Sequence, residues 1–176
     1  TLTITLSNVL IAQTANIPSA PIIGAKSYLV IDTLTNHEIA SLEPNLRLPP
    51  ASITKLMTAY VIFHALESDQ ISLEDRVMIS EKAWRMTGSR MFIEVGKKVS
   101  VQDLLMGMIV QSGNDASVAL AEFVAGSEFL FVDLMNQYAT NLNMTSSSFQ
   151  NSTGLPDENH YSTAHDLSLL AKAIII

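Results

Sequence analysis

The segment that decides the fold is residues 51–66, ASITKLMTAYVIFHAL. Its apolar side chains recur at helical spacing along one face and cover most of the other faces, which predicts a helix buried in the core. Lys55 is the only residue of this segment that carries a full charge. Because its neighbours around the helix axis are apolar, we expect burial to disfavour the charged form of Lys55 and to lower its pKa.

Ser52 stands three residues before Lys55. Two helical residues at this spacing share a face, about 5–6 Å apart at Cβ, so the lysine side chain can fold back to the hydroxyl. A neutral amine there can take the serine proton and activate the oxygen as a nucleophile. The spacing also fits a plain helix start, with Ser52 as the cap and Lys55 in water, but the apolar surroundings of Lys55 favour the catalytic interpretation.

A second candidate feature is Ser112-Gly113-Asn114, which lies between two predicted helices. One interpretation is a helix boundary, with Gly113 ending one helix and Asn114 capping the next. The other is a tight turn that presents a hydroxyl and an amide together. In that case Ser112 passes a proton between Lys55 and a leaving amine, and Asn114 binds a peptide group of the substrate.

The rest of the chain reads as mostly helical, with a few strands near its beginning. Alternation of polar and apolar residues predicts strands at residues 26–32, 38–42 and 76–79. Ser100 with Asp103, and Thr163 with Asp166, fit capping boxes, and capping suffices to explain Asp166. Residues 151–162 are predicted to be a loop. Helices are predicted at residues 80–86, 100–110, 114–125, 128–142 and from 163 onward.

Composition excludes several classes of function. The 176 residues are 48% hydrophobic and 15% charged, which fits one folded domain with a real core. The net charge of -7, without a run of Lys or Arg, argues against nucleic-acid binding. The absence of cysteine excludes disulfides, thiolate metal sites and a Cys nucleophile. The four histidines lack metal-ligand spacing, so we predict no metal and no other cofactor.

The first 25 residues contain no charged side chain. Residues 1–15 are apolar and rich in threonine, like the end of a secretory signal peptide, although an ordinary apolar strand or a loose terminus has the same composition. We therefore expect residues 1–25 to be a signal-peptide remnant and linker. No later stretch is long and apolar enough to span a bilayer.

The two candidate motifs together resemble a known family. Ser52-Ile53-Thr54-Lys55 is similar to the first motif of the serine D,D-peptidases and β-lactamases, and Ser112-Gly113-Asn114 is similar to their second. Residues 88–92 and 151–156 also look like sequence of this family. The resemblance is closest to the penicillin-binding D-alanyl-D-alanine carboxypeptidases, the low-molecular-mass serine D,D-peptidases of peptidoglycan.

The resemblance implies an α/β fold of the serine β-lactamase and transpeptidase kind, with a helical lobe beside an antiparallel sheet. It implies that Ser52 attacks the bond between two D-alanines of a peptidoglycan stem peptide, and that water hydrolyses the acyl-enzyme. Lys55 would be the base, Ser112 the proton shuttle and Asn114 a substrate contact. β-Lactam antibiotics would acylate the same serine. Such enzymes are exported to the periplasm or the outer face of the bacterial cytoplasmic membrane, often with a C-terminal helical anchor.

The sequence departs from the family pattern in one respect, because no Lys-Thr-Gly triplet, the family's third motif, occurs in it. We therefore expect residues 26–176 to be the N-terminal and helical portion of the catalytic domain, with an incomplete sheet and no activity alone. One rival is a class A-like β-lactamase, against which Gly113 in place of aspartate argues. Another rival is a D-Ala endopeptidase that cuts cross-links, which only substrate assays distinguish from a carboxypeptidase. A non-catalytic muropeptide-binding homologue is disfavoured by the intact Ser52, Lys55, Ser112 and Asn114.

Overall fold

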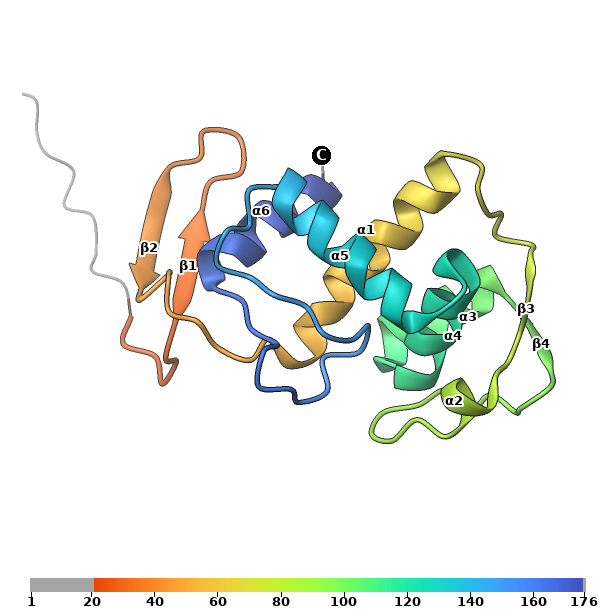
Figure 1. Ribbon diagram of the computed structural model, residues 1–176. Coiled ribbons are helices and arrows are strands. Elements are labelled where there is room, and N and C mark those ends of the chain that lie inside the picture. Colours follow the sequence, from red (N-terminus) through yellow and green to blue (C-terminus); the bar gives the residue numbers. More distant parts are fainter. Residues whose placement is uncertain (1–20, 176) are drawn as a thin grey trace, which may run out of the picture.

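The computed structural model describes residues 21–175, and Figure 1 shows the arrangement of their helices and strands. The signal-peptide remnant expected at residues 1–15 lies outside the described residues. The strands are β1 (Tyr28–Ile31), β2 (Glu38–Leu42), β3 (Arg76–Met78) and β4 (Lys98–Ser100). A short 3-10 turn, η1 (Ala51–Ile53), leads into the first helix. The helices are α1 (Thr54–Glu67), α2 (Glu81–Trp84), α3 (Val101–Gln111), α4 (Asn114–Ala125), α5 (Glu128–Asn141) and α6 (Ala164–Ile175).

Two small antiparallel sheets lie on opposite sides of the helices in the part of the molecule that the structure describes (Figure 1). In the first, β1 pairs with β2, and the Asp32 carboxylate forms the connecting turn by accepting the N–H of Thr35 at 2.7 Å. In the second, Val77 of β3 stands opposite Val99 of β4. The sequence predicted β1, β2 and β3 but not β4. The last residue of β4, Ser100, is also the N-cap of α3, so the sequence pattern there indicates the start of that helix instead.

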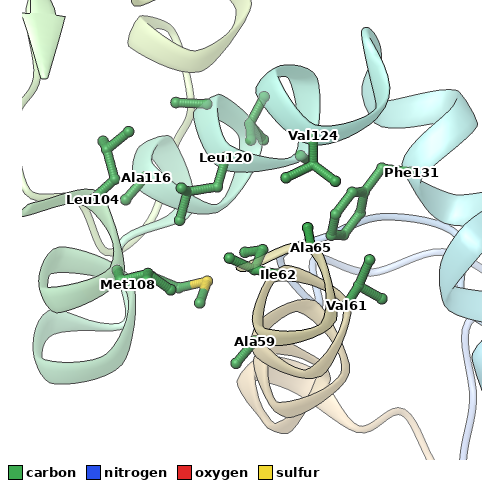
Figure 2. Packing of buried hydrophobic residues seen from close by; sticks show 14 of the residues in the cluster. Ala59, Val61, Ile62, Ala65, Leu104, Met108, Ala116, Leu120, Val124 and Phe131 are labelled. Carbon is green, nitrogen blue, oxygen red and sulfur yellow. The ribbon is translucent and has the colours of Figure 1, made fainter. Parts of the chain in front are cut away.

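Helix α1 forms the middle of the core and contacts α3, α4, α5 and α6. In Figure 2, Ile62 and Ala65 of α1 lie among the buried side chains of the neighbouring helices. Leu120 of α4 and Phe131 of α5 belong to the same cluster. The predicted buried helix is confirmed, with one exception: a strip of α1 that includes Phe63 stays partly exposed.

Serine and glycine set the ends of several helices. Ser100 begins α3, because its hydroxyl accepts the backbone N–H of Asp103 at 3.1 Å. Ser127 caps α5 through the N–H of Leu130 at 3.2 Å. Gly126 ends α4 at a φ of 80°, a left-handed conformation that glycine adopts without steric cost. The cap at Ser100 and the end of α4 at residue 125 were both predicted from the sequence. Within residues 21–175, no helix combines the length and apolarity needed to cross a membrane.

The explanation of Asp166 as a capping residue is wrong in one respect. The Thr163 hydroxyl does accept the Asp166 N–H at 3.0 Å, as the capping box requires. The buried Asp166 carboxylate, however, accepts the N–H of Ser146 at 2.8 Å and the hydroxyl of Ser147 at 2.7 Å. This side chain therefore fixes the segment after α5 against the start of α6, a long-range contact that no local pattern predicts.

Two phenylalanines of α5 test the contribution of the core to stability. Phe131 is 0% exposed and Phe129 is 74% exposed, although they are two residues apart. We expect Phe131→Ala to lower the free energy of unfolding by about 3–5 kcal/mol, because it leaves a cavity among α1, α4 and α5. Phe129→Ala should change it by less than about 0.5 kcal/mol. Urea unfolding of the two variants measures both values, and equal losses would contradict this account of the core.

Candidate active site

Ser52 and Lys55 lie where η1 runs into α1, with Ser52 exposed and Lys55 only 7% exposed. The Nζ of Lys55 is 3.4 Å from the Ser52 hydroxyl oxygen. Neither η1 nor α1 has a side-chain cap. The alternative of Ser52 as a helix cap with Lys55 in water is therefore wrong, and the predicted proximity of hydroxyl and amine is confirmed.

The buried amine of Lys55 has two further acceptors. Its Nζ donates to the side-chain oxygen of Asn114 and to the backbone carbonyl of Thr153, each at 2.8 Å. These acceptors are neutral, and burial lowers the pKa of Lys55 to about 8, as the sequence predicted. A neutral amine keeps two N–H donors for Asn114 and Thr153, which leaves its lone pair for the Ser52 hydroxyl. The geometry therefore suits transfer of the Ser52 proton to Lys55.

Asn114 is buried in the first turn of α4 and is engaged at both ends of its amide. Its Nδ2 donates to the Thr87 carbonyl at 2.7 Å, while its oxygen accepts from Lys55 at 2.8 Å. Gly88 lies so close that a Cβ there would stand 2.8 Å from Nδ2, at a φ of +81°. Asn114 therefore orients Lys55, and a contact of its amide with substrate stays a prediction.

Ser112 ends α3 in the left-handed conformation, with φ 55° and ψ 37°. The helix-boundary interpretation is wrong in detail, since Ser112 rather than Gly113 is the left-handed stop, and Gly113 rather than Asn114 is the N-cap of α4. A left-handed conformation costs a non-glycine residue free energy, and such residues cluster at functional sites. The turn carries Ser112 to the same cavity as Ser52 and Lys55.

This cavity has a volume of about 570 Å³ and collects residues from η1, α1, α3 and α6. Ser52, Lys55 and Ser112 are its polar residues, and Asn114 lies behind Lys55 outside the lining. The remaining lining is apolar: Ile53, Leu56, Ala59, Phe63, Met108, Ile109 and Ile174. Apolar walls around a few convergent polar groups are typical of a small-molecule binding site.

The loop at residues 151–156 supplies the Thr153 carbonyl to Lys55, and it is held against α1. The Thr58 hydroxyl donates to the Ser152 carbonyl at 2.7 Å, one helical turn beyond Lys55. Gly154 has a φ of +84°, and a Cβ there would lie 1.8 Å from the Ala51 carbonyl oxygen. Only glycine permits this approach of the loop to the turn that bears Ser52.

His160, which lies in the loop predicted at residues 151–162, is buried and supports residues 151–156. Its Nδ1 accepts the Gln150 N–H at 3.3 Å, so Nε2 carries the proton and donates to the Thr54 hydroxyl oxygen at 2.9 Å. Burial lowers the pKa of His160 and favours this neutral form. His160 therefore fixes the loop against the first turn of α1.

Sequence reasoning missed Asp115 and Thr153. The buried Asp115 carboxylate accepts the N–H groups of Met91 and Phe92 at 3.0 and 2.9 Å, and so fixes the segment beside the Ser112 turn. An acidic residue in the first turn of a helix is favourable, but that rule gives no hint of its loop partners. Thr153 acts through its backbone carbonyl, which any residue type supplies, so only the family-like stretch at residues 151–156 pointed to this segment.

The fold is that of the serine β-lactamase and transpeptidase class, as the sequence predicted. The structure of a mutant of the Streptomyces K15 DD-transpeptidase superposes with a TM-score of 0.80 at 29% identity, over 88% of this chain and 62% of that one. Residues 14–176 match the peptidase S11 family, described as D-alanyl-D-alanine carboxypeptidase, and the chain belongs to this family.

Individual relatives agree with that assignment. D-alanyl-D-alanine carboxypeptidase DacF of Bacillus subtilis is 44% identical over 151 residues, which are 86% of this chain and 39% of the relative. D-alanyl-D-alanine carboxypeptidase DacC of Escherichia coli is 43% identical over 162 residues, which are 89% of this chain and 40% of the relative. The structure of penicillin binding protein 5 from Haemophilus influenzae is 40% identical, with a TM-score of 0.87, over 90% of this chain and 47% of that one. The chain thus spans about two fifths of these curated relatives.

Gly154→Ala should disturb both stability and the site. Gly96 is the matched control, because its φ of +74° is similar but no atom lies within 4 Å of a Cβ placed there. We expect Gly96→Ala to cost about 1–2 kcal/mol, the strain of alanine in the left-handed region. Gly154→Ala should cost more, because the loop must also move away from Ala51. Urea unfolding of both variants checks this, and equal costs would show that the close approach is unimportant.

Proposed function

We propose that the gene product containing this chain is a serine-type D-alanyl-D-alanine carboxypeptidase. It removes the terminal D-alanine from peptidoglycan stem peptides through an acyl-enzyme on Ser52, and it is acylated by penicillin. The observation that carries the proposal is the Lys55 amine, buried among neutral acceptors with the Ser52 hydroxyl 3.4 Å away. Membership of the peptidase S11 family supports this choice of reaction.

In the proposed reaction, neutral Lys55 takes the proton of Ser52 as the serine oxygen attacks the carbonyl between the two D-alanines. The backbone N–H of Ser52 stabilises the oxyanion of the tetrahedral intermediate. The proton then passes from Lys55 through the Ser112 hydroxyl to the departing amine, as the C–N bond breaks and the ester on Ser52 remains. Attack by water on this ester regenerates Ser52 and releases the shortened peptide.

Asn114 has a positioning role in this scheme, since its oxygen fixes one N–H of Lys55 at 2.8 Å. Its predicted contact with the substrate peptide would use the remaining capacity of that amide. Residues 26–176 would form the N-terminal and helical portion of the catalytic domain, as the coverage of about two fifths of the relatives supports.

The proposed substrate also indicates on which side of the cytoplasmic membrane the protein acts. Peptidoglycan stem peptides lie outside the bacterial cytoplasmic membrane, so the protein would act there after export. Cleavage of peptidoglycan cross-links is the alternative activity, because the D-alanyl-D-alanine endopeptidase of E. coli is 33% identical to this chain. The higher identities of 43–44% to the DacC and DacF carboxypeptidases favour removal of the terminal D-alanine.

Covalent labelling tests the nucleophile. In the complete gene product, we expect a labelled penicillin to form an ester on Ser52, because its hydroxyl lies at the cavity within hydrogen-bond distance of the Lys55 Nζ, at 3.4 Å. Ser52→Ala should abolish the label without changing the fold. Mass spectrometry of tryptic peptides locates the adduct. A label that survives Ser52→Ala, or that sits on Ser112, would refute the assignment.

The pH dependence of acylation tests the base. Only neutral Lys55 accepts a proton, so the acylation rate should be highest above about pH 8, the lowered pKa of Lys55, and fall as the pH drops below it. Well below that pH the loss should approach about tenfold per unit. Lys55→Arg cannot deprotonate and should be nearly inactive at every pH. A flat profile between pH 6 and 9, or an active arginine variant, is incompatible with this role.

A further inference from the structure

A buried charge lies on the far side of the 151–156 loop from Lys55. Glu128, the first residue of α5, is 8% exposed. One carboxylate oxygen lies 2.7 Å from the Nζ of Lys82 on α2. The other accepts both the backbone N–H of Ser152 at 2.9 Å and its hydroxyl at 2.7 Å. Although burial opposes ionisation, the Lys82 ammonium and the Ser152 donors hold the pKa of Glu128 below its usual range.

These contacts hold Ser152 from two sides. Glu128 binds its N–H and hydroxyl, while the Thr58 hydroxyl of α1 donates to its carbonyl at 2.7 Å. Ser152 is 0% exposed, so it has no freedom to move without breaking these bonds. The next carbonyl along the chain, that of Thr153, is the one that accepts from Lys55. A shift of Ser152 moves the planar peptide unit that joins it to Thr153. The Thr153 carbonyl, which accepts from the Lys55 amine, begins the next peptide unit and is displaced with it.

We propose that Glu128, held by Lys82, is a positioning residue that sets the direction of the Lys55 lone pair through Ser152 and the Thr153 carbonyl. The inference rests on the proposed function, in which Lys55 must aim its lone pair at Ser52. If the Thr153 carbonyl withdraws, Lys55 loses one of its two strong acceptors and its amine rotates away from Ser52. Catalytic geometry of this kind is sensitive to displacements of about 1 Å, which can cost about 100-fold in rate.

A positioning role has a signature that a plain loop anchor lacks. A carbonyl acceptor stabilises the ammonium form of Lys55, so its loss should lower the pKa of Lys55. The acid limb of the acylation profile should then move to lower pH while the plateau rate falls. The charged groups around Glu128 are Lys82 of α2 and Asp133 of α5. All three line one surface pocket, and Asp133 stands about one turn further along α5 than Glu128. The groups that contact the Lys55 amine are all neutral.

The experiment measures the acylation rate by labelled penicillin against pH in the complete gene product. Glu128→Ala should lower the plateau at least about tenfold and shift the acid limb to lower pH. Glu128→Gln keeps an oxygen for both Ser152 donors, but its NH2 group replaces the oxygen that lies 2.7 Å from the Lys82 Nζ, so it should recover only part of the rate. Asp133→Ala, which removes an exposed carboxylate from the same helix, should match the unchanged protein.

Each other outcome has a definite meaning. An unchanged rate and profile in Glu128→Ala would overturn the inference alone, and so would a glutamine variant as slow as the alanine variant, since net charge would then be the cause. Failure of the unchanged protein to label on Ser52 would overturn the proposed function and this inference with it. If Glu128→Ala does not fold, Lys82→Met tests the same contact: slower acylation supports the inference, and the unchanged rate and profile overturn it.

Discussion

The Lys55 amine is removed from water and surrounded by neutral partners, and the rest of the site is arranged around that constraint. A buried ammonium without a counter-charge is costly, because neutral acceptors replace only part of its hydration. Asn114 and Thr153 each accept a hydrogen bond from it at 2.8 Å, and the unreplaced part lowers its pKa to about 8. The feature that makes Lys55 unfavourable for folding is therefore the one that makes it a proton acceptor near neutral pH.

Each acceptor of Lys55 depends on a support of its own. Asn114 is fixed by the Thr87 carbonyl, in a turn where Gly88 leaves room for the amide. The Thr153 carbonyl is fixed through Ser152, which two other side chains hold. Segments far apart in the sequence thus converge on one nitrogen atom, and the loop reaches it because a glycine there tolerates contact with the Ser52 turn.

The hydrophobic core makes this convergence rigid. The apolar faces of α3, α4 and α5 pack on α1 (Figure 2), so the helix that carries Lys55 cannot shift without opening the core. The junction of α3 and α4 lies beside α1 for the same reason, and it delivers Ser112 in a left-handed conformation. One strip of α1, including Leu56 and Phe63, remains uncovered and forms a wall of the cavity.

Features that depend on neighbouring residues could be predicted from the sequence: the helices, the β1–β2 hairpin, the serine cap at Ser100, and the i, i+3 pairing of Ser52 with Lys55. Periodicity, caps and spacing encode these directly. Three contacts follow instead from the packing of distant segments: Asn114 holds Lys55, Glu128 binds Ser152, and the loop turns a backbone carbonyl toward the amine. Every residue type carries a backbone carbonyl, so the sequence does not show which one accepts from Lys55. Contacts between distant segments depend on how the helices pack rather than on any local pattern.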